Sequence, residues 1–265
     1  MDFNTIFIAV FYLSVIGVIC AAILCIASRV MYVKVDERVT QLEAAMPGVN
    51  CGACGFPGCS GYAVALLEDS SIKANLCTPG GTATLNQISS ILGVEAGSIE
   101  QKTAIISCNG DKKAQQKKMD YEGIKTCEAA KMLYGGQQVC AYGCMGYGDC
   151  QVVCPSKAIC INNGFASVIK NNCTGCGLCI KVCPNKLISI ENSDIPVFIA
   201  CKNTEKGAVT RKKCTSGCIA CTKCVKECCK QAITMINNLA VIDYSKCDGC
   251  RKCVEVCITK CILKP

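Results

Sequence analysis

The chain opens with one long apolar stretch, and only short apolar runs follow it. Residues 3–28 contain no formally charged side chain. A helix needs about 20 such residues to cross the hydrocarbon core of a bilayer. A cleaved signal peptide would instead begin with basic residues and carry an apolar core of about 7–15 residues. Because Asp2 makes the start acidic and the run is longer, the pattern predicts a retained transmembrane anchor over residues 1–30.

The charges that flank this stretch predict its orientation. Arg29 and Lys34 follow it, whereas only Asp2 precedes it. Basic residues accumulate on the cytoplasmic side of membrane segments, so we expect a single pass through the cell membrane with the C-terminal region in the cytoplasm. Thiols stay reduced in that compartment, which disfavours a disulfide framework.

The rest of the pattern predicts short elements separated by glycine- and cysteine-rich loops. We expect a helix over residues 31–46 that ends at Pro47, a helix over 83–93 and a strand over 103–107. Two hairpins are predicted from alternating apolar residues around asparagine-rich turns, with strands over residues 158–161 and 166–169, and over 233–236 and 240–242. The predicted fold class is α+β, built from small metal-stabilised modules behind a transmembrane helix.

These elements divide the chain into five segments. In order they are a transmembrane anchor (1–30), a linker helix with a glycine-rich [4Fe–4S] domain (31–82), a connecting segment (83–124), and two tandem ferredoxin-like dicluster modules (125–198 and 199–265).

Cysteine dominates the composition and explains how such small modules fold. The 265 residues include 29 cysteines, no histidine and no tryptophan. Such a fraction indicates a disulfide scaffold or a metal-loaded protein. An odd count fits complete disulfide pairing poorly, and small modules with little core are commonly held together by metal. The absence of histidine leans away from zinc, which often combines the two ligands.

The formal net charge of +8 does not by itself identify a partner. Nucleic-acid-binding surfaces interleave basic residues with stacking aromatics, and this chain lacks that pattern, so we expect no nucleic-acid partner. A [4Fe–4S] cluster with four thiolates contributes about −2, so five clusters would bring the loaded protein near neutrality.

A repeat with an offset of 74 residues organises the cysteines. Nine of them recur at this offset. The first-copy members are Cys127, Cys140, Cys144, Cys150, Cys154, Cys173, Cys176, Cys179 and Cys183, and the second-copy members are Cys201, Cys214, Cys218, Cys224, Cys228, Cys247, Cys250, Cys253 and Cys257.

Three runs in the repeat have the spacing Cys-x2-Cys-x2-Cys-x3-Cys. They begin at Cys173, Cys218 and Cys247. In this bacterial ferredoxin pattern three cysteines hold one cubane and the fourth reaches the other cluster. The rule predicts three ligand sets: Cys173, Cys176, Cys179 with Cys154; Cys218, Cys221, Cys224 with Cys257; and Cys247, Cys250, Cys253 with Cys228.

The fourth set departs from the pattern because Tyr147 stands where the second copy has Cys221. Cys140 is the replacement ligand that we expect, in a set with Cys144, Cys150 and Cys183, and its counterpart Cys214 is then spare. The second copy also has Cys229 and Ile258 where the first has Pro155 and Pro184. This difference concerns loop shape rather than ligation.

A fifth set lies in the glycine-rich segment and consists of Cys51, Cys54, Cys59 and Cys77. Four cysteines within this span also suit zinc, which stays open as the alternative here. Besides Cys20 and Cys25 in the apolar stretch, seven cysteines remain without a role: Cys108, Cys127, Cys160, Cys201, Cys214, Cys229 and Cys261. Buried small residues are the plain interpretation, although the recurrence of Cys127 and Cys201 also allows ligands in an unanticipated arrangement.

With the anchor, the glycine-rich set and the dicluster modules in this order, the chain resembles the RnfB family of the Rnf complex, an ion-translocating ferredoxin:NAD oxidoreductase. The resemblance covers nearly the whole chain. Its most specific parts are Asn50 to Gly55 with Gly58-Cys59, Cys77 to Gly81, and Cys144-Met145-Gly146 leading to Cys150. It implies electron exchange with soluble ferredoxin on the cytoplasmic side and onward transfer to partner subunits, coupled to sodium or proton export. The predicted ligand cysteines correspond to the family's cluster-binding positions.

The sequence therefore predicts a membrane-anchored electron-transfer subunit with five [4Fe–4S] clusters, other subunits of an Rnf-type complex and membrane lipid as its surroundings. We find no dinucleotide fingerprint and no acid–base pair, so we expect no catalytic residues in this chain. The alternatives are an electron-input subunit of a hydrogenase or another dehydrogenase, and a zinc-binding structural protein.

Overall fold

A computed structural model describes residues 3–31 and 36–265. The chain divides into two units, residues 1–40 and 41–265. The first unit contains the predicted N-terminal helix, α1 (Phe3–Val30). One window of this helix, Val10–Val30, has a mean hydropathy of 2.7 and is long and apolar enough to cross a membrane. Asp2 and Lys34, on which the predicted orientation partly rests, lie outside the described residues.

Short helices form the glycine-rich module. They are α2 (Glu37–Ala45), α3 (Gly58–Glu68), the 3-10 helix η1 (Ala74–Leu76) and α4 (Gly81–Leu92). α2 and α4 confirm the two helices predicted in this part, although residues 32–35 of the first prediction lie outside the described residues. Leu42, Tyr62 and Ile88 are fully buried here. The Tyr62 hydroxyl donates a hydrogen bond to the Lys73 carbonyl at 2.7 Å.

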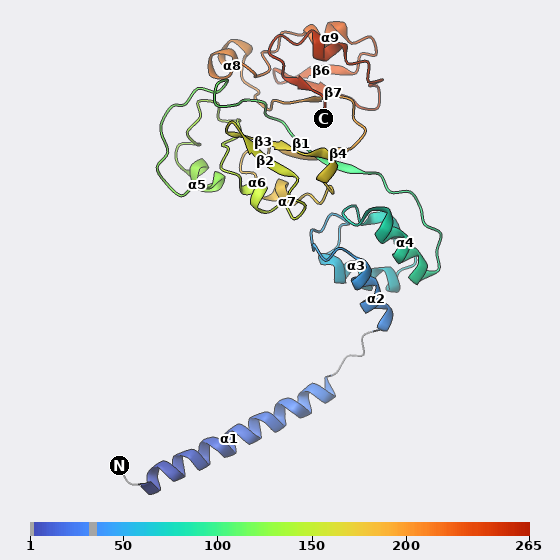
Figure 1. The fold of residues 1–265 in the computed structure, drawn as a ribbon, viewed down its shortest axis with the longest axis vertical. Helices are drawn as coiled ribbons and strands as arrows, with labels where there is room; N and C mark the ends of the chain where they lie inside the picture. Colours follow the sequence, from blue (N-terminus) through green and yellow to red (C-terminus); the bar gives the residue numbers. More distant parts are fainter. Residues whose placement is uncertain (1–2, 32–35) are drawn as a thin grey trace. The chain divides into compact units, whose positions relative to one another are not determined.

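The two cysteine-rich copies follow, and both contain a hairpin and two short helices at matching positions of the repeat (Figure 1). The first contains α5 (Cys127–Met132), α6 (Asp149–Val152), β2 (Ile159–Asn162), β3 (Phe165–Val168), η2 (Lys170–Asn172), α7 (Leu178–Lys181) and β4 (Ile188–Asn192). The second contains β5 (Phe198–Ile199), α8 (Gly207–Lys213), α9 (Lys223–Glu227), β6 (Ile233–Ile236), β7 (Leu239–Ile242), α10 (Lys252–Glu255) and β8 (Ile262–Leu263).

The β2–β3 and β6–β7 hairpins confirm the two that the sequence predicts. Asn163 and Gly164 have φ values of 49° and 81°, and Asn237 and Asn238 have 49° and 62°. Two successive residues with positive φ are typical of the primed turn that joins twisted strands. Asparagine and glycine tolerate this conformation better than other residues.

A second sheet in each copy joins strands that are distant in sequence. The predicted strand near residue 103 is β1 (Lys102–Ile106), which pairs antiparallel with β4, and β5 pairs antiparallel with β8. The pairing places β1, which the sequence assigned to a connecting segment, in a sheet of the first copy.

Backbone hydrogen bonds reveal how the copies correspond. Ser107 N–H donates to Leu187 O at 2.8 Å after β1, and Ala200 N–H donates to Cys261 O at 2.7 Å after β5. Leu187 and Cys261 are 74 residues apart, but Ser107 and Ala200 are 93 apart. The first copy therefore contains 19 additional residues between its first strand and its first cysteine run.

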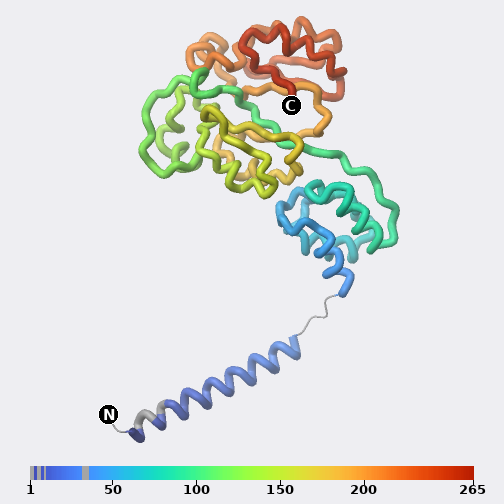
Figure 2. The backbone as a smooth tube through the Cα atoms, in the orientation of Figure 1, coloured from blue at the N-terminus to red at the C-terminus, as the bar shows by residue number. Residues whose placement is uncertain are grey.

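Part of this additional segment lies between the copies. Figure 2 shows the green chain after β1 passing from the yellow first copy to the orange second copy. Gln115 forms an antiparallel bridge with Cys214, and Lys117 forms another with Gln138. Val139 N–H also donates to Gln116 O at 2.8 Å. The bridge to Cys214 joins this segment to the second copy, whereas the contacts with Gln138 and Val139 hold it against the first copy.

Candidate iron–sulfur sites

The structure brings together the four cysteines of the glycine-rich set. Burial raises the pKa of Cys77, and the charges of Cys59, Cys51 and Cys54 add to the rise. The Asn50 side chain fixes the loop, because its Oδ1 accepts a hydrogen bond from Cys59 N–H at 2.8 Å. The other three thiols therefore lie near enough to Cys77 for their charges to act on it.

The three regular ferredoxin sets are also brought together. Burial raises the pKa of the central thiols Cys179, Cys224 and Cys253 to about 11, and neighbouring thiols contribute to each rise. In that order the neighbours are Cys176, Cys173 and Cys154; Cys218, Cys221 and Cys257; and Cys247, Cys250 and Cys228. One neighbour in each set comes from the other half of its copy, which is the crossing that the ferredoxin pattern predicts.

The cysteines that cross begin four equivalent turns. Each sulfur accepts a hydrogen bond at 3.2–3.4 Å from the backbone N–H four residues later, and each intervening third residue has a φ of 49–51°. These cysteines are Cys154, Cys183, Cys228 and Cys257. The turn is the same where Pro155 and Pro184 are present and where Cys229 and Ile258 replace them. The missing prolines therefore do not alter the loop around the sulfur.

The fourth set differs from the prediction. A hollow of about 370 Å³, counted with its opening to solvent, is lined by Cys127, Cys144, Cys150 and Cys183, and not by Cys140. Burial raises the pKa of Cys150 to about 12, with contributions from Cys144, Cys127 and Cys183. The fourth thiol near Cys144, Cys150 and Cys183 is therefore Cys127.

Local geometry explains why Cys127 occupies this place. It begins α5, and its N–H donates to both carboxylate oxygens of Asp149 at 2.9 Å. The Thr126 side chain caps the same helix by accepting from Ala129 N–H. Tyr147, which takes the place of a cysteine in the loop, packs edge-on against Tyr121 with ring centroids 5.8 Å apart. The additional segment thus supplies the thiol that its neighbouring loop lacks.

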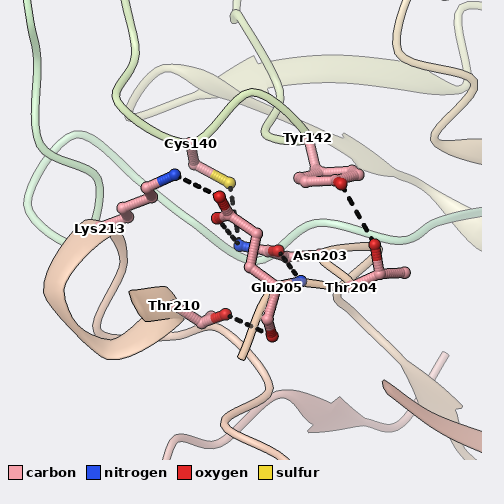
Figure 3. A network of polar contacts seen from close by, with 7 residues as sticks. All are labelled: Cys140, Tyr142, Asn203, Thr204, Glu205, Thr210 and Lys213. Atoms are coloured by element: carbon pink, nitrogen blue, oxygen red, sulfur yellow. Dashed lines mark hydrogen bonds and ion pairs between the residues drawn. The ribbon is translucent and has the colours of Figure 1, made fainter. Parts of the chain in front are cut away.

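Cys140 lies in a different group. It lines a second hollow together with Cys108, Cys201 and Cys214. Asn203 Nδ2 lies 3.8 Å from its sulfur (Figure 3). The structure therefore does not place Cys140 beside Cys144, as the sequence predicts. It places Cys140 with Cys214, the cysteine that was expected to be spare.

Three families of iron–sulfur proteins match separate parts of the chain. Residues 46–79 match the family described as "Putative Fe-S cluster", residues 140–194 match the LdpA Fe-S cluster-binding domain, and residues 240–263 match the 4Fe-4S binding domain. Together they cover parts of the glycine-rich module and of both copies.

Curated relatives match almost the whole chain, and each is the component designated B of its complex. The relative from the proton-translocating ferredoxin:NAD(+) oxidoreductase complex of Clostridium ljungdahlii is 37% identical over 92% of this chain and 86% of its own length. Its Na(+)-translocating counterpart from Acetobacterium woodii is 40% identical over 92% and 73%. The relative from the ion-translocating oxidoreductase complex of Methanosarcina acetivorans is 35% identical over 93% and 94%.

The chain belongs to the RnfB family. It is an iron–sulfur electron-transfer subunit, as the family and its iron–sulfur domains indicate. The apolar helix α1 and the family together indicate membrane association.

The thiol groups of this RnfB-family chain fit iron–sulfur clusters chemically. Clusters are held by four thiolates, and backbone N–H groups that point at the sulfurs adjust their potential. Besides the four turns described above, Ala104 N–H donates to Cys173 Sγ at 3.3 Å. Once bound, a cluster accepts or releases a single electron, and the chain's contribution is to hold the thiols and shield them from water.

The sequence contained a signal for Cys127 that the 74-residue offset conceals. That offset pairs Cys127 with Cys201, but the strands before Ser107 and Ala200 show that the counterpart of Cys201 is Cys108. Aligning the two apolar strands first would place Cys127 in an insertion. The nine-cysteine repeat therefore contains eight structural equivalences and one coincidence of numbering.

Proposed function

We propose that this RnfB-family chain is a single-pass membrane-anchored electron relay with five [4Fe–4S] clusters, four of which are held by the predicted sets and one by a corrected set. The corrected set is Cys127, Cys144, Cys150 and Cys183. The observation that carries the proposal is the convergence of four thiols at five separate points, at most of which backbone N–H groups donate to sulfur.

Contacts between the sets support an order for the relay. Lys181, which follows Cys179 in α7, donates a hydrogen bond from its Nζ to the Cys51 carbonyl oxygen at 3.0 Å. Cys179 in turn contributes to the raised pKa of Cys150. We infer that electrons pass between the glycine-rich set, the Cys173 set and the Cys150 set in that order.

Soluble ferredoxin is the proposed redox partner. The relatives are named as subunits of ferredoxin:NAD(+) oxidoreductase complexes. Residues 199–265 carry 13 basic and 5 acidic side chains, and Cys221 and Cys250 of this copy are exposed. A basic surface beside exposed ligands suits an acidic electron-transfer protein, because complementary charge steers encounter. The second copy is therefore the proposed docking region.

The remaining parts of the proposal concern the surroundings of the chain. We propose that α1 crosses the cell membrane, that the iron–sulfur region lies in the cytoplasm, and that electrons leave to other subunits of the complex. One relative is named for proton translocation and another for Na(+) translocation. Fusion of a cytoplasm-dependent fluorescent reporter to the C-terminus tests the orientation, and a dark fusion would contradict it.

Electron transfer from ferredoxin is the direct test of this function. The full chain in lipid nanodiscs, loaded with clusters, is mixed anaerobically with reduced ferredoxin while the visible absorbance of its oxidised clusters is followed. We expect rapid bleaching that slows as salt is added. Clusters that dithionite reduces but ferredoxin does not would overturn the partner, and a chain without clusters would overturn the relay itself.

A further inference from the structure

A group of four cysteines that the five proposed clusters do not use lies where the two copies meet. Cys108, Cys140, Cys201 and Cys214 line one hollow of about 320 Å³, counted with its opening to solvent. The hollows at the Cys150 and Cys224 sets measure about 370 and 350 Å³. The unassigned hollow is therefore similar in size to two of the proposed cluster sites.

The four sulfurs lie close enough to influence one another. Burial raises the pKa of Cys108 to about 12, and the charge of Cys201 adds to the rise. Burial likewise raises the pKa of Cys201 to about 11 and that of Cys214, and Cys140 contributes to both. Each thiol of the group thus has at least one other member as a neighbour.

Each copy contributes an equivalent pair. Cys108 follows β1 and Cys201 follows β5, at positions matched by the hydrogen bonds of the preceding residues. Cys140 and Cys214 are 74 residues apart and therefore match in the repeat. One hollow is therefore lined by the same two cysteine positions from each copy, as expected of a shared ligand site.

Hydrogen-bond donors converge on these sulfurs as they do at the ferredoxin sets. Cys108 Sγ accepts from Cys144 N–H at 3.3 Å, and Cys201 Sγ accepts from Cys218 N–H at 3.3 Å. Backbone N–H groups next to Cys140 and Cys214 also lower the pKa of those two thiols against the larger effect of burial. Such donors stabilise negative charge on sulfur, which buried thiols used only for packing do not require.

A polar network holds one further donor in place (Figure 3). Asn203 is 2% exposed, and its Nδ2 donates to Glu205 Oε2 at 3.2 Å as well as pointing at Cys140 Sγ. Glu205 N–H donates to Asn203 Oδ1 at 2.8 Å, and Lys213 Nζ donates to the Glu205 carboxylate. The carboxylate is thus paired with a cation while the buried amide is directed at the sulfur.

We propose that Cys108, Cys140, Cys201 and Cys214 hold a sixth [4Fe–4S] cluster that connects the two copies. The proposal rests on the electron-relay function above. Cys144 and Cys218, which donate to its sulfurs, belong to one proposed cluster of each copy. A single electron leaves one flanking cluster, reduces the bridging cluster and then reduces the other flanking cluster, and no proton or covalent bond changes place.

Zinc is the competing occupant of four thiolates. The hollow favours a cluster, because it matches two of the other cluster sites in volume and in its N–H donors. The position favours a cluster as well, since zinc has no redox chemistry and would interrupt the path between the copies. Zinc bound at this site is therefore an outcome that would overturn the proposal.

The number of clusters tests the proposal without any substitution. The full chain, purified anaerobically in nanodiscs, is analysed for iron, acid-labile sulfide and zinc, and its clusters are counted by native mass spectrometry. Six clusters predict about 24 iron atoms per chain. Five clusters, or five with one zinc, would overturn the bridging cluster and leave the relay proposal standing, whereas fewer than five would count against both.

Paired variants then locate the sixth cluster. Cys108→Ala and Cys201→Ala should each lose about four iron atoms and slow electron transfer from the second copy to the first. Cys160→Ala is the matched control, because this half-buried thiol belongs to none of the groups and hydrogen-bonds to Ser167, and it should keep every cluster. A full cluster count in both Cys108→Ala and Cys201→Ala would overturn the assignment.

Should these variants misfold, Asn203→Leu provides a second test, because it keeps all four thiols and removes the buried amide donor near Cys140. It should lower the reduction potential of one cluster. No shift of any cluster potential would count against the site.

Discussion

Replacing Cys127 tests which cysteine completes the site of Cys144, Cys150 and Cys183. Cys127→Ala removes one of the four thiols that line this hollow. Ferredoxin-type cubanes are held by four cysteine thiolates, so we expect the loss of one cluster, which is about four iron atoms per chain. Iron and sulfide analysis of the anaerobically purified variant measures this loss.

A second substitution should restore the site. Tyr147 stands in the position of Cys221, and the residues that flank each of them have positive φ: 76° and 91° at Gly146 and Gly148, 53° and 59° at Ala220 and Thr222. The backbone around Tyr147 is therefore already shaped for a ligand. In Cys127→Ala/Tyr147→Cys the iron count should return to the wild-type value.

The same rescue applied to Cys140 gives the refuting result. Cys140→Ala should also lose about four iron atoms, because Cys140 belongs to the bridging group, but Tyr147→Cys should not restore them. Rescue of Cys140→Ala by Tyr147→Cys, together with full iron in Cys127→Ala, would show that Cys140 completes the site and that the grouping described above is wrong.

Three further predictions concern packing, metal and charge. Gly146→Ala should destabilise the first copy by more than the roughly 1–2 kcal/mol that a positive φ costs, because the added Cβ would lie 2.2 Å from Gly164 O. Gly135→Ala is the control. Its φ is 75° and its added Cβ meets open space, so it should cost only the free energy of the positive φ. Thermal unfolding compares the two, and equal losses would contradict the close approach. Oxidative removal of the clusters should abolish hydrogen-exchange protection in the strands of residues 102–263, because metal ligation supplies much of the folding free energy of such modules. The helix α1 should keep its protection. Strands that stay protected without metal would contradict this prediction. Lys226→Glu and Lys252→Glu, both exposed in the second copy, should slow reduction by ferredoxin, while Lys170→Glu in the first copy should not; an equal effect of all three would argue against docking on the second copy.

Local signals in the sequence predicted the local structure well. The charge-free run predicted α1, and asparagine-rich turns predicted the β2–β3 and β6–β7 hairpins. The regular cysteine spacings predicted three groups that the structure brings together. In each case the residues that form the feature lie within one short stretch, or follow a spacing rule fixed by cluster geometry.

Long-range pairings could not be predicted in the same way. The strands β1 and β5 pair with β4 and β8 over long sequence separations, and nothing in a strand of two to five residues specifies its partner. The insertion before Cys140 then made the wrong cysteines coincide, since an offset that is correct from Cys140 onward fails before it. At that offset Cys127 coincides with Cys201, whereas the strand pairing matches Cys201 with Cys108.

Iron, acid-labile sulfide and zinc analysis of the full chain, purified without exposure to oxygen, tests the central claim that this protein is an iron–sulfur electron relay. The account predicts iron and sulfide in equal amounts, about 20 of each for the five relay clusters and about 24 with the bridging cluster, and no zinc. Zinc without acid-labile sulfide would contradict it.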